Sequence, residues 1–164
     1  MKNRKKGFTM LELIIVIAIL GIFTALTSLT FAYIRSGNVK SAAKTVDATL
    51  DTLRIETMSR FKTPKMYIYK YGDNYYMYCG YTAPDYNSAN GTKIGNNTVK
   101  ISYGSPAKEL AAGDAGCVIS YEKGNGVFSS ASPSQILFEK EEGDGVKYKI
   151  NMVIETGKHS LEKY

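Results

Sequence analysis

The chain has 164 residues, of which 44% are hydrophobic, and 21 basic and 15 acidic side chains give it a formal net charge of +6. Its length is that of one ordinary domain, and its apolar content is sufficient for a folded core, which excludes a disordered chain. One histidine, two cysteines and no tryptophan leave few groups for metal binding or nucleophilic catalysis. We therefore expect a protein that is not an enzyme and that needs no cofactor or metal.

The positive charge is concentrated at the amino terminus. Lys2, Arg4, Lys5 and Lys6 lie in the first seven positions, and the remaining chain has 17 basic and 15 acidic side chains. The basic character therefore describes a short leader rather than a general surface for polyanions.

An uncharged segment follows the leader. Residues 13–34 are 22 consecutive residues without a charged side chain. As a helix with a rise of about 1.5 Å per residue, the segment would be about 33 Å long, which matches a hydrocarbon core of about 30 Å. It exceeds the apolar region of a secretory signal peptide, which is about 7 to 15 residues long. We predict a membrane-spanning helix whose basic end lies in the cytoplasm.

A single carboxylate, Glu12, interrupts the apolar stretch near its start. In an arbitrary membrane helix such a group would lie at the bilayer edge, where its side chain reaches the headgroups at little cost. Here its surroundings are specific, because a basic leader ends at Gly7, the aromatic Phe8 follows, and Glu12 is the fifth residue counted from Phe8. This segment resembles the class III signal of type IV pilins and type II secretion pseudopilins.

The resemblance implies how the amino terminus is processed. A prepilin peptidase would cleave between Gly7 and Phe8, remove residues 1–7 as a leader and methylate the new amino group of Phe8. Residues 8–34 would form the transmembrane and filament-core helix. Glu12 would pair with the Phe8 amine of a neighbouring subunit and set the axial register, which would neutralise two charges that are costly to bury.

The chain becomes amphipathic after the uncharged segment. Its pattern predicts that the helix continues over 35–62 with one apolar stripe buried against a sheet. Pro64 is expected to end the helix, and Glu56 and Arg60 are spaced for an i,i+4 ion pair. The predicted stripe consists of Val39, Ala42, Ala43, Val46, Leu50, Leu53 and Phe61.

Short strands and turns are predicted over 63–164. Strand patterns occur at 66–71, 75–79, 98–103, 117–122, 135–139 and 146–155. The segment 83–97 is rich in Asn, Gly, Ser and Thr and is predicted to be a loop. The expected fold class is α+β, with a long amino-terminal helix packed on a mainly antiparallel sheet, as the resemblance to pilins implies. Residues 35–62 and 63–164 would together form one extracytoplasmic domain.

Cys79 and Cys117 are an even pair on the side of the membrane where a disulfide persists. We expect them to form a disulfide, which would stabilise the fold by about 4 kcal/mol in the chain-entropy model. The alternative is two separate buried thiols.

Two other groups of residues leave alternatives open. Eight of the 13 tyrosines lie between Tyr67 and Tyr86, where they can pack in and on a sheet or stack bases and sugars. We expect packing. Lys158, His159 and Lys163 can contact DNA phosphates or belong to a solvated tail, and the acidic residues nearby favour the tail.

We interpret the chain as a structural subunit of a type IV pilus. The expected partners are identical and related pilin subunits, the prepilin peptidase, the pilus assembly machinery of the inner membrane, and membrane lipid before assembly. The chain would be a single-pass protein of the cytoplasmic membrane first and part of an extracellular filament, or fimbrium, afterwards. Adhesion, twitching motility or DNA uptake would be the roles of such a filament.

Two alternatives accompany this interpretation. A pseudopilin or minor pilin of a secretion or competence system carries the same signal. In a different class, an adhesin that binds a surface ligand, or DNA, can use a pilin stalk for display.

Overall fold

The computed structural model describes residues 9–141 and 145–164, with side chains for all of these except residues 25–36. The chain divides into two compact units, Met1–Ile34 and Arg35–Tyr164. Within the described residues, the elements are helix α1 (Met10–Ser59) and nine strands. The strands are β1 (Lys65–Tyr71), β2 (Asn74–Gly80), β3 (Thr92–Gly95), β4 (Val99–Tyr103), β5 (Lys108–Glu109), β6 (Cys117–Ser120), β7 (Gln135–Lys140), β8 (Tyr148–Val153) and β9 (Lys158–Lys163).

The first unit consists of the amino-terminal part of α1. Residues 9–24 are all exposed, and they include large apolar side chains such as Met10, Ile17 and Phe23. Over the residues whose side chains are described, no helical stretch is both long and apolar enough to cross a membrane.

In the second unit, α1 is amphipathic as predicted. The six residues of the predicted stripe from Val39 to Leu53 are at most 2% exposed. The helix ends at Ser59, before Pro64, since the residue that precedes a proline avoids helical geometry. Phe61 lies beyond the helix end and is 92% exposed. The prediction that Phe61 belongs to the buried stripe is therefore wrong.

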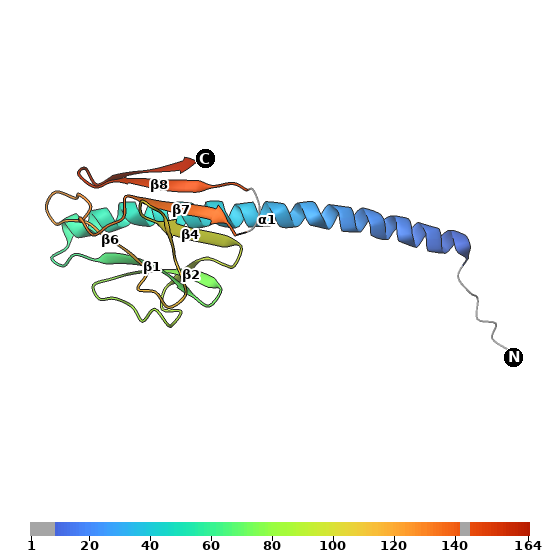
Figure 1. Ribbon diagram of the computed structural model, residues 1–164, viewed down its shortest axis with the longest axis horizontal. Helices are drawn as coiled ribbons and strands as arrows, with labels where there is room; N and C mark the ends of the chain where they lie inside the picture. The colour runs from blue at the N-terminus through green and yellow to red at the C-terminus, as the bar shows by residue number, and fades with distance from the viewer. Residues whose placement is uncertain (1–8, 142–144) are drawn as a thin grey trace. The chain divides into compact units, whose positions relative to one another are not determined.

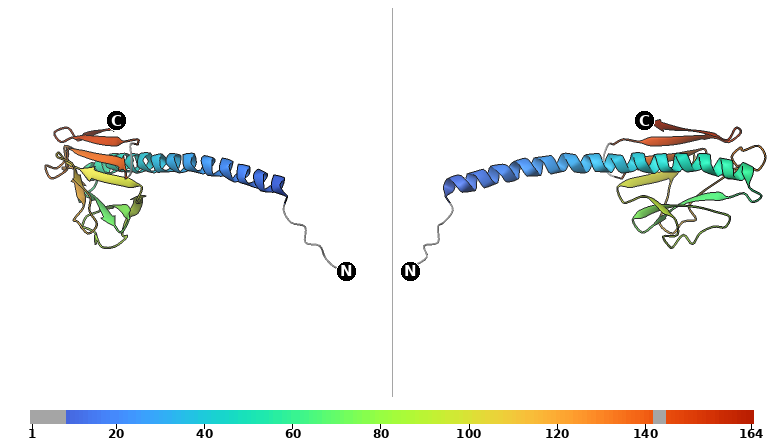
Figure 2. Two further views of the ribbon diagram at one scale, coloured as in Figure 1. Left: turned by 45° about the vertical axis from the view of Figure 1, so that its right-hand side comes forward. Right: turned by 180° about the vertical axis from the view of Figure 1, so that it is seen from behind.

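The strands form two sheets, where the sequence predicted one. The first sheet has the strand order β3-β2-β1-β6 and the second has the order β5-β4-β7-β8-β9. All strand pairs within these sheets are antiparallel, as predicted. Figures 1 and 2 show that the carboxyl-terminal part of α1 lies along both sheets. Apolar side chains of α1 and of both sheets share one core.

Three strands were missed by the sequence analysis. β3 lies inside the predicted loop 83–97, and β5 has only two residues. β9 forms where a solvated tail was expected, and it pairs with β8 in continuous register from Val153↔Lys158 to Tyr148↔Lys163. Because β9 is the edge of its sheet, only His159 and Leu161 are partly covered. A polar edge strand of this kind lacks the apolar alternation by which strands are predicted.

Candidate functional site

The start of α1 lies in the segment that carries the predicted signal. Thr9 is its cap, because the Thr9 Oγ1 atom accepts a hydrogen bond from the Glu12 amide at 3.3 Å. The Thr9 carbonyl oxygen accepts further bonds from the amides of Glu12 (3.1 Å) and Leu13 (3.2 Å). Threonine is favoured at this position because its hydroxyl accepts a hydrogen bond from an amide that has no partner within the helix. Gly7 and Phe8 lie outside the described residues.

Glu12 is placed in the first turn of α1. A carboxylate is favourable there because it faces the positive end of the helix dipole. Thr9 and Glu12 are three residues apart, which is the spacing of a capping box. The role of Thr9 was not predicted, although this Thr-x-x-Glu pattern is the signal for it.

The carboxylate of Glu12 is surrounded along the helix by exposed apolar side chains. Leu11 is 71% exposed and Leu13 is 57% exposed. In water, Glu12 is hydrated and needs no partner. If these apolar neighbours were covered by other helices, the carboxylate would lose water and would need an opposite charge. This arrangement is suited to association with other apolar helices.

Comparison with protein families identifies this amino-terminal segment. Residues 2–28 match the family model of the prokaryotic N-terminal methylation motif. The chain carries a prepilin-type signal. This signal marks substrates of prepilin processing, among both type IV pilins and pseudopilins, and it confirms the resemblance drawn from Gly7, Phe8 and Glu12. Neither the curated proteins nor the solved structures compared with the chain include a significant match.

The prepilin-type signal leaves the individual residue roles as predictions. Gly7, Phe8 and Glu12 all lie inside the matched range 2–28. Cleavage after Gly7, methylation of Phe8 and the register function of Glu12 are roles that the resemblance implies for them. Residues 29–164 lie outside the match.

The predicted disulfide is absent, since Cys79 and Cys117 are both free. Cys79 on β2 lies opposite Met66 of β1, and Cys117 on β6 lies opposite Ile68 on the other side of β1. Neighbouring strands are about 4.8 Å apart, so β2 and β6 are separated by about 10 Å. A disulfide requires Cα atoms within about 7 Å. The expectation of a disulfide is therefore wrong.

The two thiols differ in their surroundings. Cys117 is 1% exposed, and its burial raises the pKa of the thiol to about 12. Cys79 is exposed at the surface. Protein atoms around its thiol remove part of the water, and this desolvation, together with the nearby Glu56 carboxylate, also raises the pKa of the thiol. Both effects favour the neutral thiol over the reactive thiolate.

The tyrosines between Tyr67 and Tyr86 pack on one another, as expected. Tyr69 stacks on Tyr76 with ring centroids 6.0 Å apart, and Tyr86 packs edge-on against Tyr69 at 5.5 Å. The Tyr69 hydroxyl donates a hydrogen bond to the Ser88 carbonyl oxygen at 3.2 Å. Tyr86, which follows β2, thus helps to cover the face of the sheet that carries Tyr69. Met66 and Ile68 are buried on the other face, so β1 is buried on both faces.

The side chain of His159 is covered by its neighbours and is not part of a solvated tail. Its side chain is 8% exposed, and its Nε2 atom lies 3.5 Å from Asp47 Oδ1 and 3.6 Å from Asp51 Oδ1. These contacts join β9 to α1. Lys158 and Lys163 on the same strand remain exposed. The two aspartates make this face of β9 a poor site for DNA phosphates.

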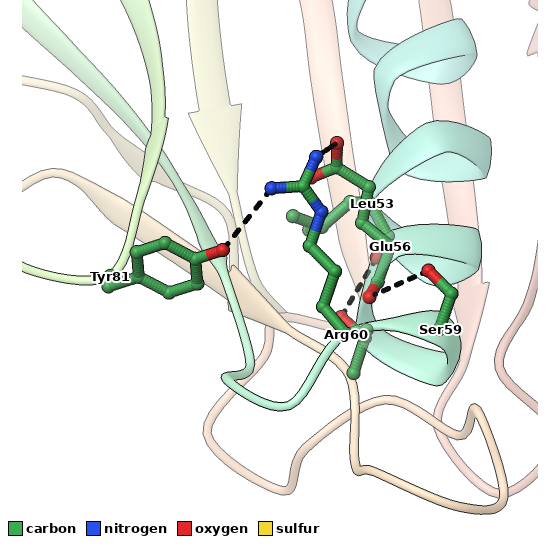
Figure 3. Close-up of polar contacts among 6 residues, drawn as sticks. Leu53, Glu56, Ser59, Arg60 and Tyr81 are labelled. Carbon is green, nitrogen blue, oxygen red and sulfur yellow. Dashed lines mark hydrogen bonds and ion pairs between the residues drawn. The ribbon is translucent and has the colours of Figure 1, made fainter.

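A polar cluster lies at the carboxyl end of α1 (Figure 3). The predicted ion pair is present, with Arg60 Nη2 at 3.1 Å from Glu56 Oε1. Arg60 Nη1 donates a hydrogen bond to the Tyr81 hydroxyl at 3.4 Å. The Tyr81 hydroxyl and the Glu56 carboxylate together raise the pKa of Arg60. Tyr81 and its contact with Arg60 were not predicted, because residues 21 positions apart give no local signal.

No group of three or more potential metal ligands occurs in 9–141 and 145–164. Among the charged residues near β7, Lys147 Nζ lies 3.2 Å from Glu139 Oε1, an exposed ion pair of the kind that contributes little stability.

Proposed function

We propose that the chain is a structural subunit of a type IV pilus, processed between Gly7 and Phe8 and assembled through its amino-terminal helix. The prepilin-type signal over residues 2–28 is the observation that carries the proposal. It is supported by the exposure of the large apolar side chains within residues 10–24. Residues 8–34 would span the membrane before assembly, and 35–164 would lie outside the cytoplasm.

Assembly would move an apolar helix from lipid into a bundle of similar helices. Lipid tails are as apolar as leucine, so the transfer gains little from the hydrophobic effect. Cohesion would come from close packing of side chains between neighbouring helices and from the few polar contacts that form among them. In this description, a polar contact in the bundle has a strong influence on which neighbour binds and in which register.

Glu12 is the residue suited to such a contact. It would face the free amine that cleavage creates at Phe8 of a neighbouring subunit, so that two buried charges neutralise each other. Removing one partner of a buried ion pair costs about 3–5 kcal/mol, because the other charge stays unpaired. A subunit in the wrong register would incur that cost, which favours a single register.

The processing step is tested by mass spectrometry of the mature protein from cells that contain a prepilin peptidase. We expect the mature chain to begin with a methylated Phe8 and to lack residues 1–7. Gly7→Leu should remain uncut, because a bulky side chain replaces glycine at the cleavage position, and Gly7→Ala serves as the milder control. An unprocessed wild-type chain in such cells would contradict the proposal.

The assembly step is tested with variants of Glu12. Glu12→Val should be cleaved and inserted normally but should be excluded from filaments. Glu12→Asp is the matched control and should retain incorporation, because it keeps the charge. Filaments with a normal content of Glu12→Val would disprove the register function while leaving processing intact.

Immunogold electron microscopy of cells separates the remaining roles. Label along whole surface filaments would support a major pilin. Loss of secretion or transformation without surface filaments would instead assign the chain to the pseudopilins or minor pilins. Binding of a glycan or host protein to 35–164, with no effect of the chain on filament assembly, would favour an adhesin on a pilin stalk.

A further inference from the structure

The end of α1 exposes aromatic and basic side chains side by side. Phe61 is 92% exposed, Tyr81 is 47% exposed, and Met58 in the last turn is 55% exposed. We define the α1-end patch as Met58, Arg60, Phe61, Lys62, Tyr81 and Lys123. The patch lies within 35–164 and is distinct from the prepilin-type signal.

Each exposed ring of the patch is accompanied by a cation. The Lys123 Nζ atom lies 4.6 Å from the centroid of the Phe61 ring and also donates a hydrogen bond to the Phe61 carbonyl oxygen at 3.1 Å. The Lys62 Nζ atom lies 5.9 Å from the centroid of the Tyr81 ring. Arg60 reaches the Tyr81 hydroxyl from the helix, as Figure 3 shows. Tyr81 is therefore contacted by two cations, Lys62 and Arg60, and Phe61 by one, Lys123.

The patch is locally basic although residues 8–164 are nearly balanced in charge. Residues 57–72 contain Arg60, Lys62, Lys65 and Lys70 and no acidic residue. Two carboxylates lie beside the patch: Glu56 pairs with Arg60, and Glu122, which precedes Lys123, accepts a hydrogen bond from the Asn125 side chain. An anionic ligand would meet at least two cations here, Lys62 and Lys123, for which the structure gives contacts with rings or a carbonyl oxygen rather than with a carboxylate.

We propose that the α1-end patch binds a single-stranded nucleic acid. Bases would stack on the open faces of Phe61 and Tyr81, and phosphates would contact Lys62, Lys123 and Arg60. Aromatic platforms combined with a positively charged groove or surface are the general means by which proteins bind single strands without sequence preference. Unstacked bases are needed for this mode of binding, which excludes a duplex.

An acidic glycan fits the patch less well. Sugar hydroxyls require several neutral donors and acceptors, and the polar groups nearest the rings already have partners within the chain. The Tyr81 hydroxyl accepts a hydrogen bond from Arg60, and Ser59 Oγ donates one to the Glu56 carbonyl oxygen at 3.3 Å. The apolar surface of Phe61 and Met58 favours the flat face of a base.

The test is fluorescence anisotropy of the full chain in a neutral detergent with labelled single-stranded oligothymidylate and oligouridylate. With three cations in contact with phosphates, we expect the logarithm of the association constant to fall with the logarithm of salt concentration at a slope of about −2. Oligothymidylate and oligouridylate should bind within a few-fold of each other, because stacking does not read the sugar. The assay needs no filaments, so it succeeds or fails independently of the proposed pilus function.

Variants separate stacking from charge. Phe61→Ala should weaken binding about tenfold, whereas Phe61→Tyr should retain it. Lys123→Gln should make the salt slope shallower by about 0.7, and Lys44→Gln, at an exposed position on α1 outside the patch, should leave it unchanged. All three positions are exposed, so the unfolding midpoints of the four variants should match that of the wild type.

Three results would each overturn the proposal. The first is wild-type affinity in both Phe61→Ala and Lys123→Gln. The second is equal affinity for a blunt duplex or for inorganic polyphosphate, since neither offers unstacked bases. The third is binding of polygalacturonate that depends on Phe61, without binding of either oligonucleotide, which would identify an acidic glycan as the ligand.

Discussion

Two stretches of α1 carry apolar side chains in opposite ways. Over residues 10–24 the apolar side chains are exposed, with no buried residue among them, whereas from Val39 to Leu53 the apolar stripe is at most 2% exposed. The second stretch is stabilised by the sheets of its own chain. The side chains of residues 10–24 are exposed instead, and their apolar composition becomes favourable in lipid or among other helices. The same residue types therefore serve folding in one stretch and, under the proposed function, would serve association in the other.

The largest expected difference between the two stretches is in how truncation of an apolar side chain changes the free energy of unfolding. Leu50→Ala should lower the free energy of unfolding of 35–164 by about 2–5 kcal/mol, because it leaves a cavity in the core. Ile17→Ala, at a residue that is 60% exposed, should change it by less than about 0.5 kcal/mol. Urea unfolding of the full chain in detergent, followed by tyrosine fluorescence, measures both. Equal effects would show that the first stretch also packs on the domain.

The reactivity of the two thiols tests how well the core of the second unit is shielded from solvent. In the native chain Cys117 should be almost unreactive at pH 8, because burial raises the pKa of its thiol from 9.0 to about 12 and lowers the thiolate fraction about a thousandfold. Cys79 should react slowly. Titration with a thiol reagent in denaturant without reductant should give two thiols per chain. Fewer than two would indicate that Cys79 and Cys117 form a disulfide after all.

The Cys117 thiol also predicts a dependence of stability on pH. Its pKa is raised in the folded state, so above about pH 9 the unfolded chain loses a proton that the folded chain keeps. The contribution of this group to stability is complete below pH 9 and is lost progressively as the pH rises from there toward 12. Cys117→Ala should remove that part of the alkaline loss. An unchanged alkaline transition in this variant would contradict the burial of the thiol.

Replacing an alanine by a larger residue should also distinguish the two stretches, with a smaller change in the free energy of unfolding. Ala43→Leu places three extra carbon atoms into a fully buried position and should destabilise 35–164 by about 1–3 kcal/mol. Ala18→Leu, at an exposed position of the first stretch, should be neutral in the same urea titration. A destabilising Ala18→Leu would show contacts for the first stretch that its exposure does not indicate.

The smallest effect concerns the start of the helix. Thr9→Ala should cost about 1 kcal/mol of local helix stability, because the Glu12 amide loses its acceptor. Thr9→Ser should retain the cap. Hydrogen exchange of the Glu12 and Leu13 amides should be faster in the alanine variant alone, whereas 35–164 should unfold as in the wild type. Unchanged exchange at Glu12 would rule out the cap.

Much of α1 could be predicted from the sequence because its signals are local. The stripe from Val39 to Leu53 follows from the helical period, and the pair of Glu56 and Arg60 follows from an i,i+4 spacing. Phe61 fitted the same period but lies past the helix end, so periodicity alone placed it wrongly. The helix ends at Ser59, whereas the apolar pattern continues to Phe61.

The contacts between distant strands could not be predicted in this way. Pairing Cys79 with Cys117 by elimination ignored the strand order, which places β1 between them. β9 was missed because an edge strand needs no apolar face, and the burial of His159 depends on Asp47, which is 112 positions away. The two rings of the α1-end patch likewise come from segments 20 residues apart. Each of these arrangements depends on topology rather than on composition.

The contact of His159 with Asp47 and Asp51 has a consequence for the order of folding. Strand β9 is the last strand of the chain, and it pairs with β8 and touches the helix that was synthesised first. During synthesis or passage across a membrane, the helix therefore waits for more than a hundred residues before these partners arrive. Formation of β9 thus completes the contact of His159 with the Asp47 and Asp51 carboxylates of α1.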